Sequence, residues 1–422
     1  MKILHVCQNY FPSKGGPQYS VQQVSEKLVE YYGDEVAVAT TDSLYDPASP
    51  LFKKVKPAEE CINGIPVHRY PFHRWHRNLF KYVNKVKAKL TGTGLPYTIG
   101  KRLGAPASPQ LHGAMDAFDG DVIMATTAAY NFCDYPTWRF KTNNPKPFVL
   151  HGAIHLHKEP HAQDRAIIRA KTCDCYIANT EFEKNKLVEY GMQPNKIITA
   201  GIGVSIAQLQ VEQRAVDEFK AAHNIQTSDF VIGFVGRLEV GKGVALLINA
   251  VRTLCKKHTH IKLLLAGAKT AYCSEIKRLI TQENLPIILL ENFDDSVKPL
   301  IYHAMNIFDL PSTSESFGVV FLEAWACKKP VLAARMGATA SLIKDGKEGL
   351  LFELDNIDDL ITKIEILIAD QHLQTALGVQ GYHKILDNYT WEKIIPAYRQ
   401  AYLLGIKNFR QLVHQKALAI QQ

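Results

Sequence analysis

The sequence lacks long apolar runs, and its cysteines are not spaced like metal or redox sites. Apolar segments such as 244–248 fall far short of the roughly 20 residues that span a bilayer, so no membrane-spanning helix is expected. Among the eight cysteines, the close pair Cys173 and Cys175 has neither zinc-ligand nor redox spacing. These absences exclude a zinc ribbon and a disulfide scaffold, and they predict reduced, mostly buried thiols.

The beginning of the sequence also lacks the features of a secretory signal. Residues 1–6 enter an apolar, strand-like pattern without an h-region or a small-residue cleavage site, so we expect a cytoplasmic protein. The composition, with 46% hydrophobic and 21% charged residues, is that of a globular protein. A length of 422 residues favours two domains over a single core.

Acidic residues are missing from one long segment. Residues 68–102 contain nine Lys or Arg and no Asp or Glu, which leaves 40 basic against 41 acidic residues elsewhere. Arg69, Tyr70, Trp75 and other basic and aromatic residues interleave there. Such a segment suits an anionic membrane surface, to which the protein would bind peripherally, or a phosphate-bearing acceptor. A solvated loop and helix face is an equal alternative, and no nucleic-acid-binding module accompanies the charge, so no nucleic-acid partner is expected.

Short β-branched runs alternate with helical patterns along the whole chain. In the first half such runs lie at 3–7, 36–39, 122–125, 148–150 and 176–178, and in the second half at 231–235, 261–266, 287–290, 307–310, 331–333 and 350–352. This alternation predicts an α/β protein with two doubly wound, Rossmann-like parallel sheets that face each other across a cleft. We place the first domain at residues 1–204, completed by a helix at 390–422, and the second at 205–389.

A glycine-rich turn follows the predicted strand 231–235. Residues 236–243 read G-R-L-E-V-G-K-G, which nearly matches the NTPase phosphate loop, but Gly243 stands where that loop needs a magnesium-binding hydroxyl. The turn places two cations, Arg237 and Lys242, where a helix begins, and both can reach a diphosphate. A surface turn with solvated charges is an equally open interpretation of this segment alone.

A second turn follows the predicted strand 307–310 and begins another helix. The free amides of residues 317–319 and the positive end of the helix dipole favour an anion. Glu315 falls in the turn, and Glu323 lies about two helical turns further on. A carboxylate at 323 can accept two hydrogen bonds from a vicinal diol such as ribose, although two glutamates at this spacing are more often simply exposed.

The frame E-S-F-G-V-V-F-L-E-A at 315–324 resembles the E-x7-E signature of retaining, family 4 glycosyltransferases with the GT-B fold. The upstream G-R-L-x-x-x-K-G and the downstream Pro330 to Ala333 and Gly346 to Leu351 extend the resemblance over most of 231–355. The resemblance implies that Arg237 and Lys242 neutralise the diphosphate in place of a metal, that Glu323 holds the ribose, and that Glu315 contacts the donor sugar. No cofactor is then expected.

The amino-terminal half resembles the family more loosely. Gly15 and Gly16 follow the first strand, where a glycine pair lets the backbone approach a ligand closely. His151 follows the strand 148–150, where the family often places a histidine at the donor sugar; His155 and His157 share its loop, and no acidic or cysteine partner completes a metal site there. The expected catalytic residues are His151, Glu315, Arg237 and Lys242; the expected donor-binding residues are Gly15, Gly16, Arg237, Lys242, Phe293, Glu315, Ser316, Phe317, Gly318, Val319 and Glu323.

The function implied by this resemblance is transfer of a sugar from a UDP- or GDP-sugar to a saccharide or lipid-linked saccharide, as in the synthesis of cell-envelope polysaccharides. Departures such as Gly337-Ala338, where Gly-Gly is usual, lie close to the expected cleft and leave the donor open. Three alternatives remain: a nucleotide-sugar epimerase of the same fold, a non-catalytic nucleotide-sugar sensor, and a P-loop NTPase, against which Gly243 argues.

Overall fold

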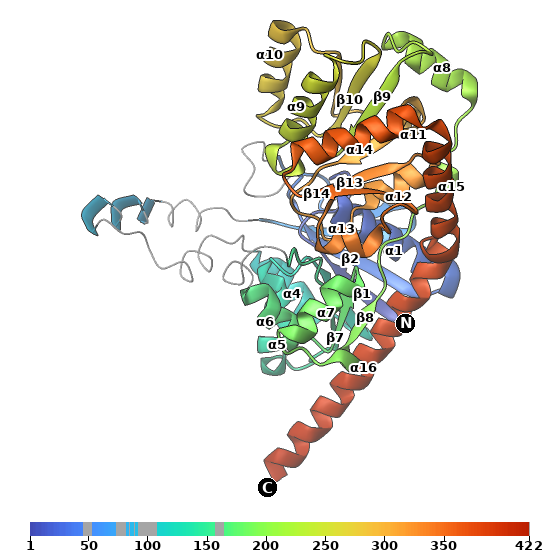
Figure 1. The fold of residues 1–422 in the computed structure, drawn as a ribbon. Coiled ribbons are helices and arrows are strands. Elements are labelled where there is room, and N and C mark those ends of the chain that lie inside the picture. Colours follow the sequence, from blue (N-terminus) through green and yellow to red (C-terminus); the bar gives the residue numbers. More distant parts are fainter. Residues whose placement is uncertain are drawn as a thin grey trace.

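The computed structural model describes residues 1–44, 53–72, 108–156 and 164–421, together with 82–83, 85–87 and 89–91. Two lobes, each built on its own sheet, are visible in Figure 1. Within the described part of the chain, no helix combines the length and the apolar character needed to cross a bilayer. The prediction of an α/β protein with two Rossmann-like sheets is confirmed.

Among the described residues, the first sheet has eight strands in the order β3-β4-β2-β1-β5-β6-β7-β8, of which only the pair β3–β4 is antiparallel. Its strands are β1 (Lys2–Val6), β2 (Glu35–Thr41), β3 (Glu59–Ile62), β4 (Ile65–Tyr70), β5 (Val122–Thr126), β6 (Phe148–His151), β7 (Cys175–Ala178) and β8 (Ile197–Thr199). Its helices are α1 (Gly16–Tyr32), α4 (Pro109–Ala117), α5 (Tyr135–Trp138), α6 (Asp164–Thr172) and α7 (Glu181–Glu189), with short 3-10 helices η1 (Asn131–Asp134), η2 (Arg139–Lys141) and η4 (Pro194–Lys196).

The second sheet has six parallel strands in the order β11-β10-β9-β12-β13-β14, which is the Rossmann order. Its strands are β9 (Phe230–Val235), β10 (Ile261–Gly267), β11 (Ile287–Glu291), β12 (Ile307–Leu310), β13 (Val331–Arg335) and β14 (Gly349–Glu353). The helices of this half are α8 (Gln213–Ala222), α9 (Val244–Leu254), α10 (Cys273–Glu283), α11 (Lys298–Ala304), α12 (Val319–Ala326), α13 (Gly337–Leu342), α14 (Ile357–Ala369) and α15 (Gln371–Asn388), with 3-10 helices η5 (Ile206–Leu209), η6 (Val240–Lys242) and η7 (Asp295–Val297).

The hairpin of β3 and β4 was not predicted from the sequence. Its turn is Asn63-Gly64, and both residues have positive φ, at 50° and 82°, as a two-residue hairpin turn of type I′ requires. Arg69, one of the nine basic residues of segment 68–102, lies on β4. Its side chain is buried and donates hydrogen bonds to the carbonyls of Phe11 at 2.6 Å and Pro57 at 3.2 Å, so its charge is not available to a membrane.

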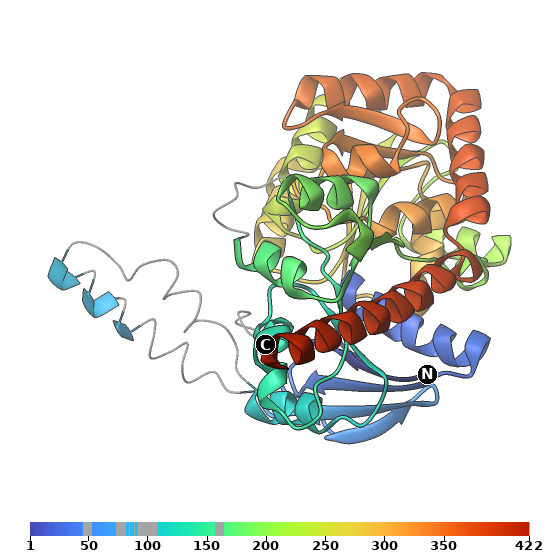
Figure 2. The same cartoon turned by 90° about the horizontal axis from the view of Figure 1, so that it is seen from below.

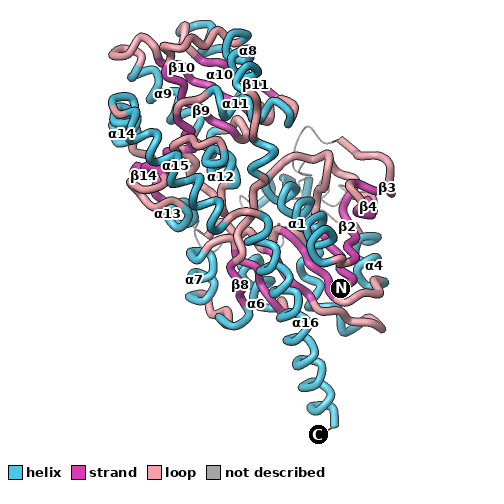
Figure 3. Tube along the Cα trace, turned by 90° about the vertical axis from the view of Figure 1, so that its right-hand side faces the viewer, coloured by secondary structure: helices cyan, strands magenta, loops and turns pink. Residues whose placement is uncertain are grey.

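The last helix, α16 (Trp391–Gln421), returns to the first sheet and packs against β6, β7, β8 and α1. Figure 2 shows it crossing the first lobe, and its C-terminal end extends past the body of the protein in Figures 1 and 3. The two chain crossings between the lobes lie side by side, because Val204 N donates to Tyr389 O at 2.9 Å and Tyr398 Oη donates to Gly201 O at 3.0 Å. The crossings thus behave as one joint.

A buried ion pair fixes α16 to the first sheet. Arg139 and Asp174 make two side-chain hydrogen bonds, of which Nη2–Oδ1 measures 2.9 Å, and both side chains are nearly inaccessible. The guanidinium of Arg139 stacks on the ring of Phe409 in α16 at 4.6 Å, and Asn408 donates to the carbonyl of Asp174 at 2.8 Å. The charges of Arg139 and Asp174 thus compensate each other where α16 packs on the first sheet. Such compensation is needed because an unpaired buried charge is strongly destabilising.

Asp309, in the middle of β12, is buried differently. It is fully inaccessible, and neither carboxyl oxygen has a hydrogen-bond partner among the described residues. Burial raises the pKa of Asp309 well above its ordinary value, because the charged form is disfavoured in an apolar interior. The folded protein is therefore most stable when the carboxyl group of Asp309 is protonated.

We expect Asp309→Asn to remove the loss of stability that the wild-type protein shows as pH rises. An acid whose pKa is raised on folding contributes stability that is fully present below its unfolded pKa and lost as pH rises towards the folded pKa, by about 1.4 kcal/mol per unit. The melting temperature of the variant relative to wild type should therefore rise between pH 4 and pH 8 in a calorimetric scan. The exposed Asp217→Asn is the control, and a constant difference across this range contradicts the assignment.

Candidate functional site

The turns after β9 and β12 in the second domain meet because these strands are neighbours at the point where the strand order reverses. Ile307 pairs with Ile232 and Phe308 with Gly233, so the turns after both strands lie at the carboxyl edge of the sheet, where open α/β sheets bind ligands. Thr313 Oγ1 donates to the carbonyl of Gly241 in the other turn at 3.2 Å. The two turns are therefore in direct contact.

Gly243 is required by this contact. Its φ is 77°, and a Cβ atom at this position would lie 2.0 Å from the carbonyl oxygen of Pro311. A serine or threonine therefore cannot occupy the position without moving the second turn. This geometry explains why the magnesium-binding hydroxyl of an NTPase phosphate loop is missing, and it argues against that alternative.

Lys242 and Glu315 form an ion pair across the two turns. Lys242 Nζ lies 2.6 Å from Glu315 Oε1 and 3.3 Å from the carbonyl oxygen of Ser314. The side chains are only 18% and 11% exposed, so solvent screens this pair less than a surface pair. An arriving anion finds the ammonium group already held in position, with Glu315 beside it.

Arg237 is placed less tightly than Lys242. Its guanidinium is 3.1 Å from Glu239 Oε1, and 65% of the side chain is exposed. Exposed ion pairs contribute little and reorganise easily. The structure therefore places Arg237 in the same turn as Lys242 but leaves its side chain free to turn towards a ligand.

Glu323 is held by two residues that the sequence did not single out. It is 7% exposed, and its carboxylate accepts hydrogen bonds from Lys298 Nζ at 3.0 Å and Tyr302 Oη at 2.7 Å. The charge of Glu323 raises the pKa of Lys298, and burial raises the pKa of the Tyr302 phenol well above its usual value. Both partners lie on α11, so this helix fixes the orientation of the carboxylate. No signal in the sequence pointed to them.

The N-terminus of α12 has the geometry of an anion-binding turn. Gly318 precedes the helix with φ 91°, and a Cβ atom there would meet the ring of Phe321 at 2.5 Å. The Phe317 side chain is buried against Tyr389 with ring centroids 5.8 Å apart. The side chain of Phe317 therefore anchors the turn, and only its backbone can meet a ligand. Ser316 and Val319, on either side, are partly exposed.

The first domain faces these turns with its own glycine loop. Gly15 and Gly16 stand at the start of α1, and nothing lies within 4 Å of a Cβ atom built on Gly16. Lys14 reaches Asp295 of the second domain, with Nζ–Oδ2 at 3.2 Å. Gly16 therefore lies beside open space, whereas a Cβ atom on Gly15 would meet Gln18 Oε1 at 2.5 Å; Lys14, which makes the contact between the domains, was not predicted.

His151 and His155 occupy different environments. His151 is 1% exposed, its Nε2 lies 2.7 Å from Asn179 Oδ1, and burial lowers the pKa of its imidazole. His155, four residues later, crosses to the second domain, where its Nδ1 lies 2.8 Å from Ser314 Oγ. The structure brings His155, rather than His151, to the turn that carries Glu315. The catalytic role of His151 stays a prediction, and His157 lies outside the described residues.

Phe293 follows β11, at the far end of the same edge. It is partly buried against the core of the second domain. The preceding Asn292 stabilises the turn. Its backbone N–H donates to Gly267 O at 2.8 Å, and its side-chain Oδ1 accepts a hydrogen bond from Lys269 N at 2.9 Å. A stacking role for Phe293 stays a prediction.

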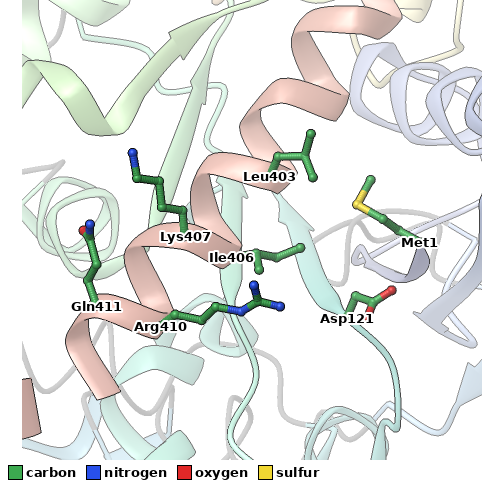
Figure 4. A pocket seen from close by; sticks show the side chains of 7 residues that line it. All are labelled: Met1, Asp121, Leu403, Ile406, Lys407, Arg410 and Gln411. Atoms are coloured by element: carbon green, nitrogen blue, oxygen red, sulfur yellow. The ribbon is translucent and has the colours of Figure 1, made fainter. Parts of the chain in front are cut away.

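A separate hollow of about 480 Å³ lies between α16 and the first sheet. Ile406 and Arg410 point from α16 towards Asp121 in Figure 4, with Met1 nearby. Met1 and Asp121 precede β1 and β5, so this hollow is at the amino edge of the sheet, opposite to the carboxyl edge. It is not part of the candidate site.

Two family models match the chain. Residues 14–208 match Glycosyltransferase Family 4, and residues 215–384 match Glycosyl transferases group 1. The chain is similar to the capsular polysaccharide biosynthesis glycosyltransferase CapM of Staphylococcus aureus, with 29% identity over 53% of this chain and 60% of CapM. It is also similar to the uncharacterised glycosyltransferase MJ1178 of Methanocaldococcus jannaschii, with 26% identity over 95% of this chain and 98% of the relative.

Solved structures share the fold. Anabaena HepE, solved in complex with UDP and glucose, has a TM-score of 0.72 over 95% of this chain and 98% of HepE, at 20% identity. At this level of identity the likeness concerns the fold alone. The alignment with CapM covers less than two thirds of that relative's length.

We expect Lys242→Ala to weaken binding of a nucleoside diphosphate by about 10- to 100-fold, because a hydrogen bond to a charged group contributes about 1.5–3 kcal/mol. Titration calorimetry with the free nucleotide measures this. Lys257→Ala is the matched control, since Lys257 forms an exposed ion pair with Glu365 at 2.8 Å outside the candidate site. Equal affinities of Lys242→Ala and wild type would remove Lys242 from the site.

Proposed function

Because this chain belongs to the family 4 and group 1 glycosyltransferases, we propose that it transfers a sugar from a UDP- or GDP-sugar to a saccharide or lipid-linked saccharide. The observation that carries this proposal is the partly buried pairing of Lys242 with Glu315 where the two turns meet. It offers a fixed cation and a fixed carboxylate within reach of one diphosphate sugar. The name of CapM supports a role in polysaccharide synthesis.

In the proposed reaction, the bond between the anomeric carbon and the departing phosphate breaks, and a bond to the acceptor hydroxyl forms on the same face of the sugar. The acceptor proton passes to the departing phosphate. Lys242 and Arg237 stabilise the negative charge that develops there, together with the amides at the N-terminus of α12. These protein groups replace a metal ion, and isolation of a covalent glycosyl-enzyme adduct would contradict this retaining route.

Glu323 is proposed to hold the ribose. Its carboxylate is oriented by Tyr302 and Lys298, and a carboxylate has lone pairs left for a diol after accepting two hydrogen bonds. His151 and Phe293 keep their proposed roles at the sugar and the base. The complex of HepE with UDP and glucose supports testing uridine donors first.

The experiment that tests this function is thermal stabilisation by UDP, GDP, ADP and their sugar conjugates, with and without EDTA. A ligand at 100 times its Kd stabilises the native state by about 2.7 kcal/mol. We expect a selective shift with uridine or guanosine diphosphates that EDTA leaves unchanged. A shift that EDTA abolishes contradicts metal independence, and no shift contradicts the donor site.

Product analysis then separates the alternatives. A transferase releases the nucleotide only when an acceptor is present, and the product keeps the donor's anomeric configuration. Conversion of the donor without an acceptor would identify an epimerase. Binding without any turnover across an acceptor panel would favour a sensor.

We also propose that the basic segment 68–102, of which residues 68–72, 82–83, 85–87 and 89–91 are described, binds an anionic membrane surface that carries the acceptor. Tyr82, Val86 and Leu90 follow one another at a spacing of four residues and are exposed, at 68%, 39% and 79%. Lys85 and Lys89 lie exposed between them. Apolar side chains flanked by lysines suit the boundary between headgroups and acyl chains.

We expect the protein to sediment with vesicles rich in anionic lipid at low salt and to be released as salt is raised. Val86→Asp with Leu90→Asp should abolish sedimentation while leaving the nucleotide-induced thermal shift unchanged. Leu354→Asp is the control, because Leu354 is an exposed apolar residue of the second domain, at 41%. If wild type stays in the supernatant at low salt, the membrane proposal is wrong.

A further inference from the structure

The loop after β6 is the part of the first domain that touches the turn carrying Glu315. It spans residues 151–156 and contains Ala153, a non-glycine residue with φ 48°. A backbone in this region is retained only where its surroundings hold it. Two backbone bonds fix the beginning of the loop, from Thr127 N to His151 O and from Ala128 N to Gly152 O, both 2.9 Å.

A single side chain holds the next amide of the loop. Glu183 Oε1 accepts a hydrogen bond from Ile154 N at 2.9 Å and another from Tyr176 Oη at 2.5 Å, while its Oε2 accepts from Asn179 N at 2.7 Å. Glu183 is 2% exposed and lies in the first turn of α7, behind the N-cap residue Thr180. The carboxylate thus ties the loop to the adjacent strand and helix.

The three donors to Glu183 are all neutral. Burial raises the pKa of its carboxyl group to about 7, against the opposing effect of these hydrogen bonds. Asp174, by contrast, is buried together with the cation of Arg139. Burying a carboxylate without a cation is costly, and here three hydrogen bonds and the N-terminus of α7 compensate part of that cost.

We propose that Glu183 is a positioning residue for sugar transfer, which fixes loop 151–156 so that His155 meets Ser314 across the domains. This inference rests on the proposed function. His155 is the residue after the amide that Glu183 holds, and Ser314 precedes Glu315 directly. The carbonyl of Ser314 also receives a hydrogen bond from Lys242. Displacement of the loop would therefore move Ser314 and with it Glu315, which is proposed to contact the donor sugar rather than the nucleotide.

The direct test is Glu183→Gln, which keeps the shape of the side chain but turns an acceptor into an amide NH₂ beside one of its donors. Because about 1 Å of misplacement can cost 100-fold in rate, we expect kcat to fall by about 10- to 100-fold. The Kd for the free nucleotide should not change, because the second domain binds it. A merely structural role would instead lower stability and affinity together. The exposed Glu181→Gln, on the same helical turn, is the control.

A double-mutant cycle with His155→Ala identifies the route. If Glu183 acts through His155, the double variant loses no more activity than the more damaging single variant, whereas additive losses contradict the proposal. Tyr176→Phe removes one donor to the same carboxylate and carries the test if Glu183→Gln does not fold; it should reduce kcat in the same direction. If both variants keep the wild-type kcat, the role of Glu183 is wrong but the proposed function stands. If the wild-type enzyme neither binds nucleotide nor transfers sugar, the proposed function is wrong as well.

Discussion

The close approach of the backbone at Gly243 to the carbonyl of Pro311 is the contact on which the site depends. It forces the turns after β9 and β12 together, and this brings Lys242 within 2.6 Å of Glu315. A larger residue at 243 would push the two turns apart and break the ion pair between Lys242 and Glu315. Glycine is therefore required at 243 by packing, which explains why the hydroxyl of the phosphate-loop pattern is absent. Lys242, the cation that this turn shares with the phosphate loop, belongs here to a site built from two turns.

The second constraint is the joint between the domains. Gly203 allows the first crossing to pass the indole of Trp391, because a Cβ atom there would come within 2.6 Å of that ring. The second crossing leads into α16, which the pair of Arg139 and Asp174 fixes to the first sheet. Beyond this joint the domains also meet at Lys14 and Asp295, an exposed ion pair that adds little stability.

Sequence reasoning located the strands and the two turns well, because β-branched runs and glycine spacing are local signals. It missed the hairpin of β3 and β4, although Asn63-Gly64 is a recognisable turn. It did not separate His151 from His155, because burial and contact across the domains are properties of the assembled fold. Lys298 was beyond reach for the same reason: nothing in the sequence indicates that α11 packs beside α12 and orients Glu323.

Three buried carboxylates show how the fold divides structural from functional demands. Asp174 has a guanidinium partner and serves the docking of a helix. Asp309 has no partner among the described residues and is tolerated because it can stay protonated. Glu183 lies between these cases, with three neutral donors and a pKa of about 7. It gains no cation, and one of its donors belongs to the loop that crosses the domains. Its three hydrogen bonds and its place at the N-terminus of α7 offset part of the cost of its burial. The carboxylate in turn fixes the direction of an amide in that loop, which apolar contacts do not do.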